Sequence, residues 1–115
     1  MWKVNHAARV FLAIGSTDMR KAINGLSVLV QEQMGETLFS GDLFAFCSRR
    51  RKLVKILYWS GNGFCLWQKR LEKQKFKWPE SEEEVVTIDQ RQMSWLLDGL
   101  DISQAHQRLE YSANF

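Results

Sequence analysis

The chain has 115 residues, of which 45% are hydrophobic and 25% charged, the size and composition of one globular domain. This length excludes a two-domain enzyme, no apolar run approaches the ~20 residues of a membrane span, and the N-terminus lacks the apolar stretch of a signal peptide, so we expect a cytoplasmic protein. The net charge of +3 conceals a strong asymmetry, because residues 49–77 hold ten basic residues and one acid, a formal charge of +9, and leave −6 to the remainder.

The N-terminal part predicts a strand followed by a helix. Residues 9–14 form an apolar run typical of a buried strand. Ser16 or Thr17 is suited to cap a helix, and Asp18 places a negative charge in its first turn. Apolar residues then recur at helical spacing until Gly35, which we expect to end the helix.

The middle of the chain predicts a series of strands joined by tight turns. Ser60-Gly61-Asn62-Gly63 is a strong hairpin signal, because Asn-Gly accepts the positive φ angles of a tight turn. The predicted strands are 43–47, 53–59, 64–71 and a short segment 76–78, which Pro79 ends.

The C-terminal part predicts one more strand and a second helix. An acidic loop, 80–84, precedes a strand at 85–88. Asp89 and Gln92 have the spacing of a capping box, and the apolar stripe of the helix that follows comprises Met93, Leu96, Leu97 and Leu100. We expect the polar tail 103–115 to fray.

Together these elements predict a single domain, 1–115, of the α+β class. Its expected architecture is an antiparallel β-meander of about four to six strands packed against one or two helices. Alternate turns of a meander lie at the same end of a sheet, so we expect the turns 49–52 and 72–75 to be neighbours. Pairing across the hairpin at 60–63 places Lys55 opposite Gln68 or Arg70.

The basic residues therefore gather at one end of the predicted sheet. One interpretation is a surface that holds DNA phosphates, and the other is a solvated charge run that protects a sheet edge from aggregation. Under the first interpretation the DNA-binding residues are Arg49, Arg50, Arg51, Lys52, Lys55, Lys69, Arg70, Lys73 and Lys75.

The aromatic residues among these cations have two interpretations, base stacking and core packing. We expect core packing for most of them, with Trp78 as the exception because it adjoins Pro79 at a strand end. Trp95 lies off the apolar stripe of its helix, which favours an exposed anchor for a protein partner.

The sequence predicts no metal site, cofactor or catalytic residue. Cys47 and Cys65 lie far apart in sequence, and His6 and His106 are near the termini, so neither the spacing of a zinc site nor a nucleophile-base pair is present. A metal-dependent nuclease would require acids that converge from the predicted strands, and no such pair is present. The aspartates are explained instead by helix ends and a turn: Asp18, Asp42, Asp89, Asp98 and Asp101.

Several segments resemble one known family over roughly residues 8–102. The family is the small accessory protein, called TnpB and encoded by the second reading frame, of insertion sequences of the sixty-six type, which is distinct from the RNA-guided nucleases of the same name. The segments are TDMRKAINGL (17–26), SGDLFAF (40–46), KILYW (55–59), GFCLWQKRLE (63–72), FKWP (76–79) and WLLDGLD (95–101).

The resemblance implies a bacterial mobile-element protein needed for transposition, whereas strand transfer belongs to a separate, larger transposase. Ser60 stands where the family usually has Asp, and we interpret this position as a turn residue that serine can occupy. Residues 51–54 also depart from the family pattern, which makes this loop more cationic.

Two functions are therefore expected of the chain. The first is a non-catalytic accessory factor that contacts DNA through the basic loops. The alternative is a subunit that docks on the transposase through the acidic loop 80–84 and the helix carrying Trp95. The sequence leaves the oligomeric state open.

Overall fold

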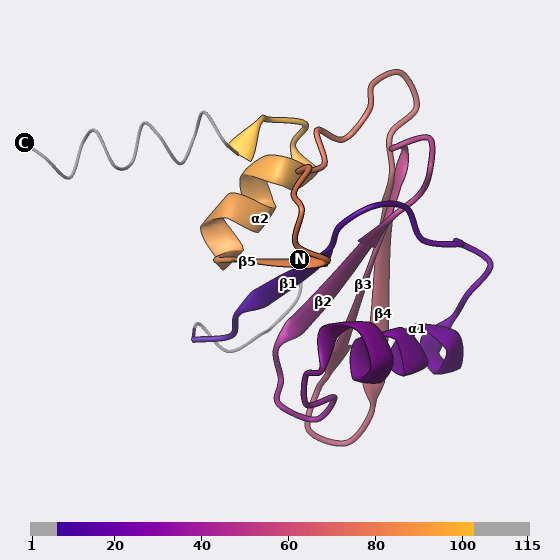
Figure 1. Cartoon of the computed structure of the whole chain (residues 1–115), viewed down its shortest axis with the longest axis vertical. Coiled ribbons are helices and arrows are strands. Elements are labelled where there is room, and N and C mark those ends of the chain that lie inside the picture. Colours follow the sequence, from indigo (N-terminus) through magenta and orange to yellow (C-terminus); the bar gives the residue numbers. More distant parts are fainter. Residues whose placement is uncertain (1–6, 103–115) are drawn as a thin grey trace, which may run out of the picture.

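A computed structural model describes residues 7–102, and the predicted fraying of 103–115 falls outside these residues. The fold is built on a five-stranded sheet in the order β4-β3-β2-β1-β5 (Figure 1). The strands are β1 (Val10–Ala13), β2 (Leu43–Cys47), β3 (Leu53–Trp59), β4 (Phe64–Arg70) and β5 (Val85–Ile88).

The pairing of the strands confirms the α+β class but makes the sheet mixed. The meander β2-β3-β4 is antiparallel as predicted, with Lys55 opposite Gln68. β1, however, lies parallel to β2, with Val10 beside Leu43, and β5 pairs antiparallel to β1 on its other side. A parallel pair needs a crossover connection, and the first helix provides it.

The first helix, α1 (Ile23–Leu29), continues into a π-helical turn, η1 (Val30–Met34), and ends at Gly35 in the left-handed conformation, φ 63°. The prediction that this helix begins at Ser16 or Thr17 is wrong. Ala22 is the N-cap residue and its side chain caps nothing. The carboxylate of Asp18 instead accepts the backbone N–H of Arg20, which closes a separate turn before the helix.

Two further local predictions are corrected. In the β3–β4 turn the left-handed residue is Gly61, with φ 66°, and not Asn62. Residues 76–78 form no strand, because this segment crosses the face of the sheet that α2 covers, where it has no strand beside it. Phe76 and Trp78 are both buried there.

The second helix, α2 (Gln90–Leu97), begins with the predicted capping box. The Asp89 carboxylate accepts the Gln92 backbone N–H at 2.7 Å, and the Gln92 side chain accepts that of Asp89 at 3.0 Å. Leu100, predicted to continue the apolar stripe, lies beyond the helix and is 50% exposed. Within residues 7–102, no helix is long and apolar enough to cross a membrane.

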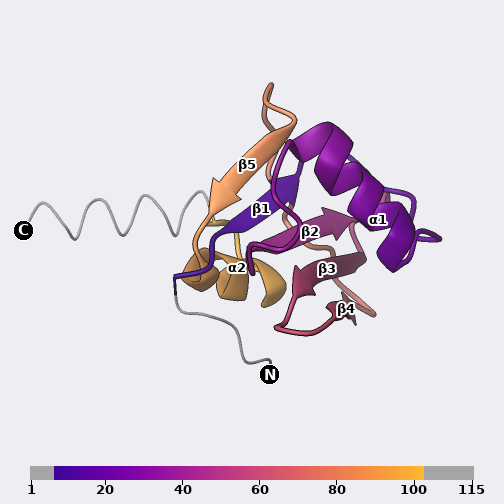
Figure 2. The same cartoon turned by 90° about the horizontal axis from the view of Figure 1, so that it is seen from below.

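The two helices cover opposite faces of the sheet (Figure 2). On one face, α1 and η1 bury Leu26 and Val30 against Phe44, Phe46 and other strand residues. On the other, the core beneath α2 includes Leu12, Ile56, Trp78, Met93 and Leu96. Two packed faces leave the strand ends and their loops as the surface on which charged residues can gather.

Candidate nucleic-acid interface

The two basic turns, 48–52 and 71–75, lie side by side at one end of the sheet, as predicted (Figure 1). The backbone N–H of Leu71 donates to the Lys52 carbonyl at 2.8 Å, and that of Phe76 donates to the Arg51 carbonyl at 2.7 Å. The Lys52 ammonium adds a longer contact, 3.5 Å, to the Glu72 carbonyl. We call these two hydrogen-bonded turns the paired loops.

Four predicted cations project from the paired loops into solvent: Arg49, Arg50, Lys73 and Lys75. In the part of the chain that the structure describes, none of them forms an ion pair. Lys77 is exposed beside them, since its neighbours Phe76 and Trp78 point into the core. Lys75 and Lys77 also line a hollow of about 530 Å³ against the end of α2. The alternation of aromatic residues with lysine in this segment is the sequence pattern that indicates an exposed Lys77.

Three other predicted residues lie at the paired loops but have partners there. Arg51 donates from Nη1 to the Gly15 carbonyl at 2.7 Å, and thereby ties the β2–β3 loop to the chain that follows β1. Lys52 contacts Glu72 as described above. Arg70 pairs with the Glu72 carboxylate at 3.1 Å, an exposed contact of small energetic value.

Lys55 and Lys69 do not belong to this surface. Lys55 is 9% exposed, and its ammonium donates to the carbonyls of Met19 at 2.7 Å and Lys21 at 3.1 Å. Lys69 lies on the α2 face and donates to the Leu97 carbonyl at 2.9 Å, near the end of that helix. A signal for the burial of Lys55 was present in the sequence, because the register places it on the same face as Leu57 and the core of that face.

Arg51 is the one non-glycine residue with positive φ, at 61°, among residues 7–102. We expect Arg51→Ala to be less stable than Arg51→Gly by about 1 kcal/mol, because both variants lose the contact to Gly15 and only alanine resists this conformation. Urea unfolding of the two variants measures the difference. Equal stability would contradict the strained conformation.

The acidic loop 80–84 lies at the same end of the sheet but on its other side, next to β5. The backbone N–H of Ile14 donates to the Glu84 carbonyl, which extends the β1–β5 ladder at that edge. Across residues 7–102, no glutamate of this loop forms an ion pair with a basic side chain of the paired loops. The four exposed cations are therefore not neutralised by it.

Local contacts and burial explain the shifted pKa values of Asp18 and Cys47, two groups near the paired loops. Hydrogen bonds from the Arg20 side chain and backbone hold the pKa of the Asp18 carboxyl well below its usual range. Burial raises the pKa of the Cys47 thiol, against the smaller opposite effect of the Arg51 guanidinium, so this thiol is protonated at neutral pH. No three His, Cys, Asp or Glu side chains of the described chain meet in a metal-binding group, and His6 and His106 lie outside it.

Two aromatic residues singled out in the sequence have other surroundings than predicted. Trp78 is 6% exposed, and its indole Nε1 donates to the Ala13 carbonyl at 2.9 Å, so the prediction that it lies outside the core is wrong. Trp95 is half-buried against the α2-side core, and the Arg91 guanidinium lies 5.3 Å from its ring centre. Trp95 is therefore less exposed than the sequence predicted, and its role as an anchor for a protein partner stays a prediction.

Comparisons with known proteins agree with the resemblance. The uncharacterized protein y4hO of Sinorhizobium fredii is 40% identical over 93 residues, covering 81% of this chain and 81% of the relative. A second uncharacterized protein of that organism, y4jC, is 32% identical over 93 residues, covering 81% and 80%. No solved structure matches the chain. The model of a family described as IS66 Orf2-like protein matches residues 8–107, and the chain belongs to this family.

Proposed function

We propose that the protein is a non-catalytic accessory factor of transposition that holds DNA through its paired loops. The observation that carries the proposal is the joining of two loops by backbone hydrogen bonds, which gathers Arg49, Arg50, Lys73 and Lys75 without acidic partners. Contacts from arginine and lysine to phosphates position a protein on DNA and carry no sequence information. Under this proposal the paired loops contact the phosphates of a duplex, and this contribution to binding carries little sequence preference.

Binding of this kind depends strongly on salt, because each neutralised phosphate releases condensed counterions. Four phosphate contacts predict that log affinity falls with log salt concentration with a slope of roughly −4. A charge run that serves to protect a sheet edge requires no binding at all. The slope therefore separates the two interpretations that the sequence left open.

We expect the double variant Arg49→Ala/Arg50→Ala to reduce the steepness of this slope by about 1.8, and Lys73→Ala/Lys75→Ala to do the same. The measurement is fluorescence anisotropy of a labelled duplex at several salt concentrations. Arg91→Gln, on α2 and away from the paired loops, is the control and leaves the slope unchanged. Unaltered binding by both double variants would contradict the proposal.

A further inference from the structure

The outer edge of the sheet at β5 has backbone groups without a partner strand in the part of the chain that the structure describes. Among the described residues 7–102, β5 pairs with β1 alone. The ladder of hydrogen-bonded pairs includes Ile14 with Glu84 and therefore Leu12 with Val86. In an antiparallel ladder the intervening residues turn their N–H and C=O away from the partner strand. Val85 and Thr87 thus direct these groups outward, and within residues 7–102 no backbone hydrogen bond outside the β1 ladder uses them.

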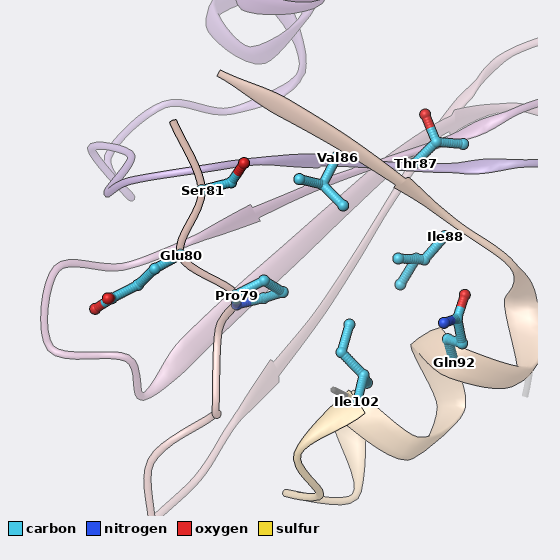
Figure 3. A pocket seen from close by; sticks show the side chains of 8 residues that line it. All are labelled: Pro79, Glu80, Ser81, Val86, Thr87, Ile88, Gln92 and Ile102. Atoms are coloured by element: carbon cyan, nitrogen blue, oxygen red, sulfur yellow. The ribbon is translucent and has the colours of Figure 1, made fainter. Parts of the chain in front are cut away.

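A groove with an apolar side and a polar side, the latter formed by Glu80, Ser81, Thr87 and Gln92, runs beside this edge (Figure 3). It has a volume of about 350 Å³ and lies between β5, residues 79–81 and the region of α2. Val86 and Ile88 project into it from β5, and Pro79 and Ile102 face them. In a strand that paired with β5, every second side chain would point to the side of the sheet on which the groove lies. Those side chains would meet the apolar residues of the groove.

The chain around the groove is strongly acidic. Residues 79–89 contain five acids and no lysine or arginine. Glu80, Glu82, Glu83 and Glu84 are all exposed, and none forms an ion pair within the described chain. Such a charge attracts a cationic partner and repels nucleic acid, because the interaction sign follows the net charge of the patch.

We propose that β5 binds an extended basic peptide of a protein partner, which adds a strand to the free edge and places apolar side chains in the groove. Outward backbone groups supply the main-chain bonds of strand addition, and the groove selects alternate apolar residues. The glutamates select lysine or arginine at the other positions. This inference does not rest on the proposed DNA contact, which involves other residues.

The probe for this proposal is a labelled, capped peptide of alternating lysine and valine, titrated with the full chain by fluorescence anisotropy. Thr87→Pro removes one outward N–H and no bond to β1, so we expect it to weaken binding about tenfold. Thr87→Ser retains the N–H and is the matched control, with unchanged affinity. The triple variant Glu82→Gln/Glu83→Gln/Glu84→Gln should both weaken binding and reduce its salt dependence.

A second peptide, identical but with methylated backbone nitrogens, separates strand pairing from charge attraction. Equal binding of both peptides, or equal binding by Thr87→Pro and the unmodified chain, would overturn the proposal. Two further results would also overturn it by assigning the edge to another occupant. One is a dimer in sedimentation that Thr87→Pro abolishes, and the other is NMR contacts between 103–115 and β5 in the chain alone.

Discussion

Replacing Trp78 by alanine is expected to destabilise the protein by about 3–5 kcal/mol, because the change removes a buried indole and leaves a cavity. Trp78 packs in the α2-side core, and its Nε1 donates to the Ala13 carbonyl at the end of β1. The loss is a large share of the roughly 5–15 kcal/mol that stabilises a domain of this kind. We expect the melting temperature to fall by roughly 10–20 °C.

Trp78→Phe isolates the hydrogen bond, since it retains much of the ring volume and leaves the Ala13 carbonyl without its donor. An intermediate loss of about 1–3 kcal/mol is expected. Trp59→Phe is the matched control, because the structure gives the half-exposed Trp59 aromatic neighbours, Phe39 and Phe64. If Trp78→Ala were no more damaging than Trp59→Phe in calorimetry, the buried placement of Trp78 would be wrong.

Lys55→Met is expected to destabilise the fold by about 2–3 kcal/mol, because the carbonyls of Met19 and Lys21 lose the charged donor that the buried Lys55 supplies. Removing the desolvated charge offsets part of this loss. The substitution also frees the turn that precedes α1, so the amides at the start of that helix should exchange with deuterium faster. Chemical denaturation and hydrogen exchange measure the two effects.

The same variant distinguishes a structural lysine from a phosphate-binding one. At temperatures where Lys55→Met is folded, its salt slope for DNA binding should equal that of the unmodified chain. Lys69→Met is the parallel case, with one carbonyl losing its donor and an expected cost of about 1 kcal/mol. A reduced slope for Lys55→Met alone would place its ammonium on the DNA surface after all.

Local signals were sufficient to predict the meander and its loops. The strands β2, β3 and β4 have turn residues between them, and the spacing across the 60–63 turn determines which residues pair. The adjacency of the paired loops follows from that register. Four of the nine predicted DNA-binding residues are exposed there without ion-pair partners in the described chain.

Contacts between distant segments could not be predicted in the same way. The carbonyls that accept from the Lys55 ammonium belong to Met19 and Lys21, up to 36 residues earlier in the chain. A helix that began at the predicted position would use the same carbonyls for its own backbone hydrogen bonds. The Ala13 carbonyl that holds Trp78 is 65 residues away. The parallel placement of β1 beside β2 likewise depends on how α1 packs, which no local turn specifies.

The strand order places the acidic groove at the β5 edge of the sheet and the paired loops over β2, β3 and β4. Two inter-strand steps separate β2, where the first of the paired loops begins, from β5, and four separate β4 from β5, so the distances are roughly 10–19 Å. These distances exceed the Debye length of about 8 Å at physiological ionic strength, so the charges of the paired loops and of the acidic groove are largely screened from one another. A duplex on the paired loops and a cationic peptide on β5 would then bind without mutual competition, and the chain would act as an adaptor in a ternary complex.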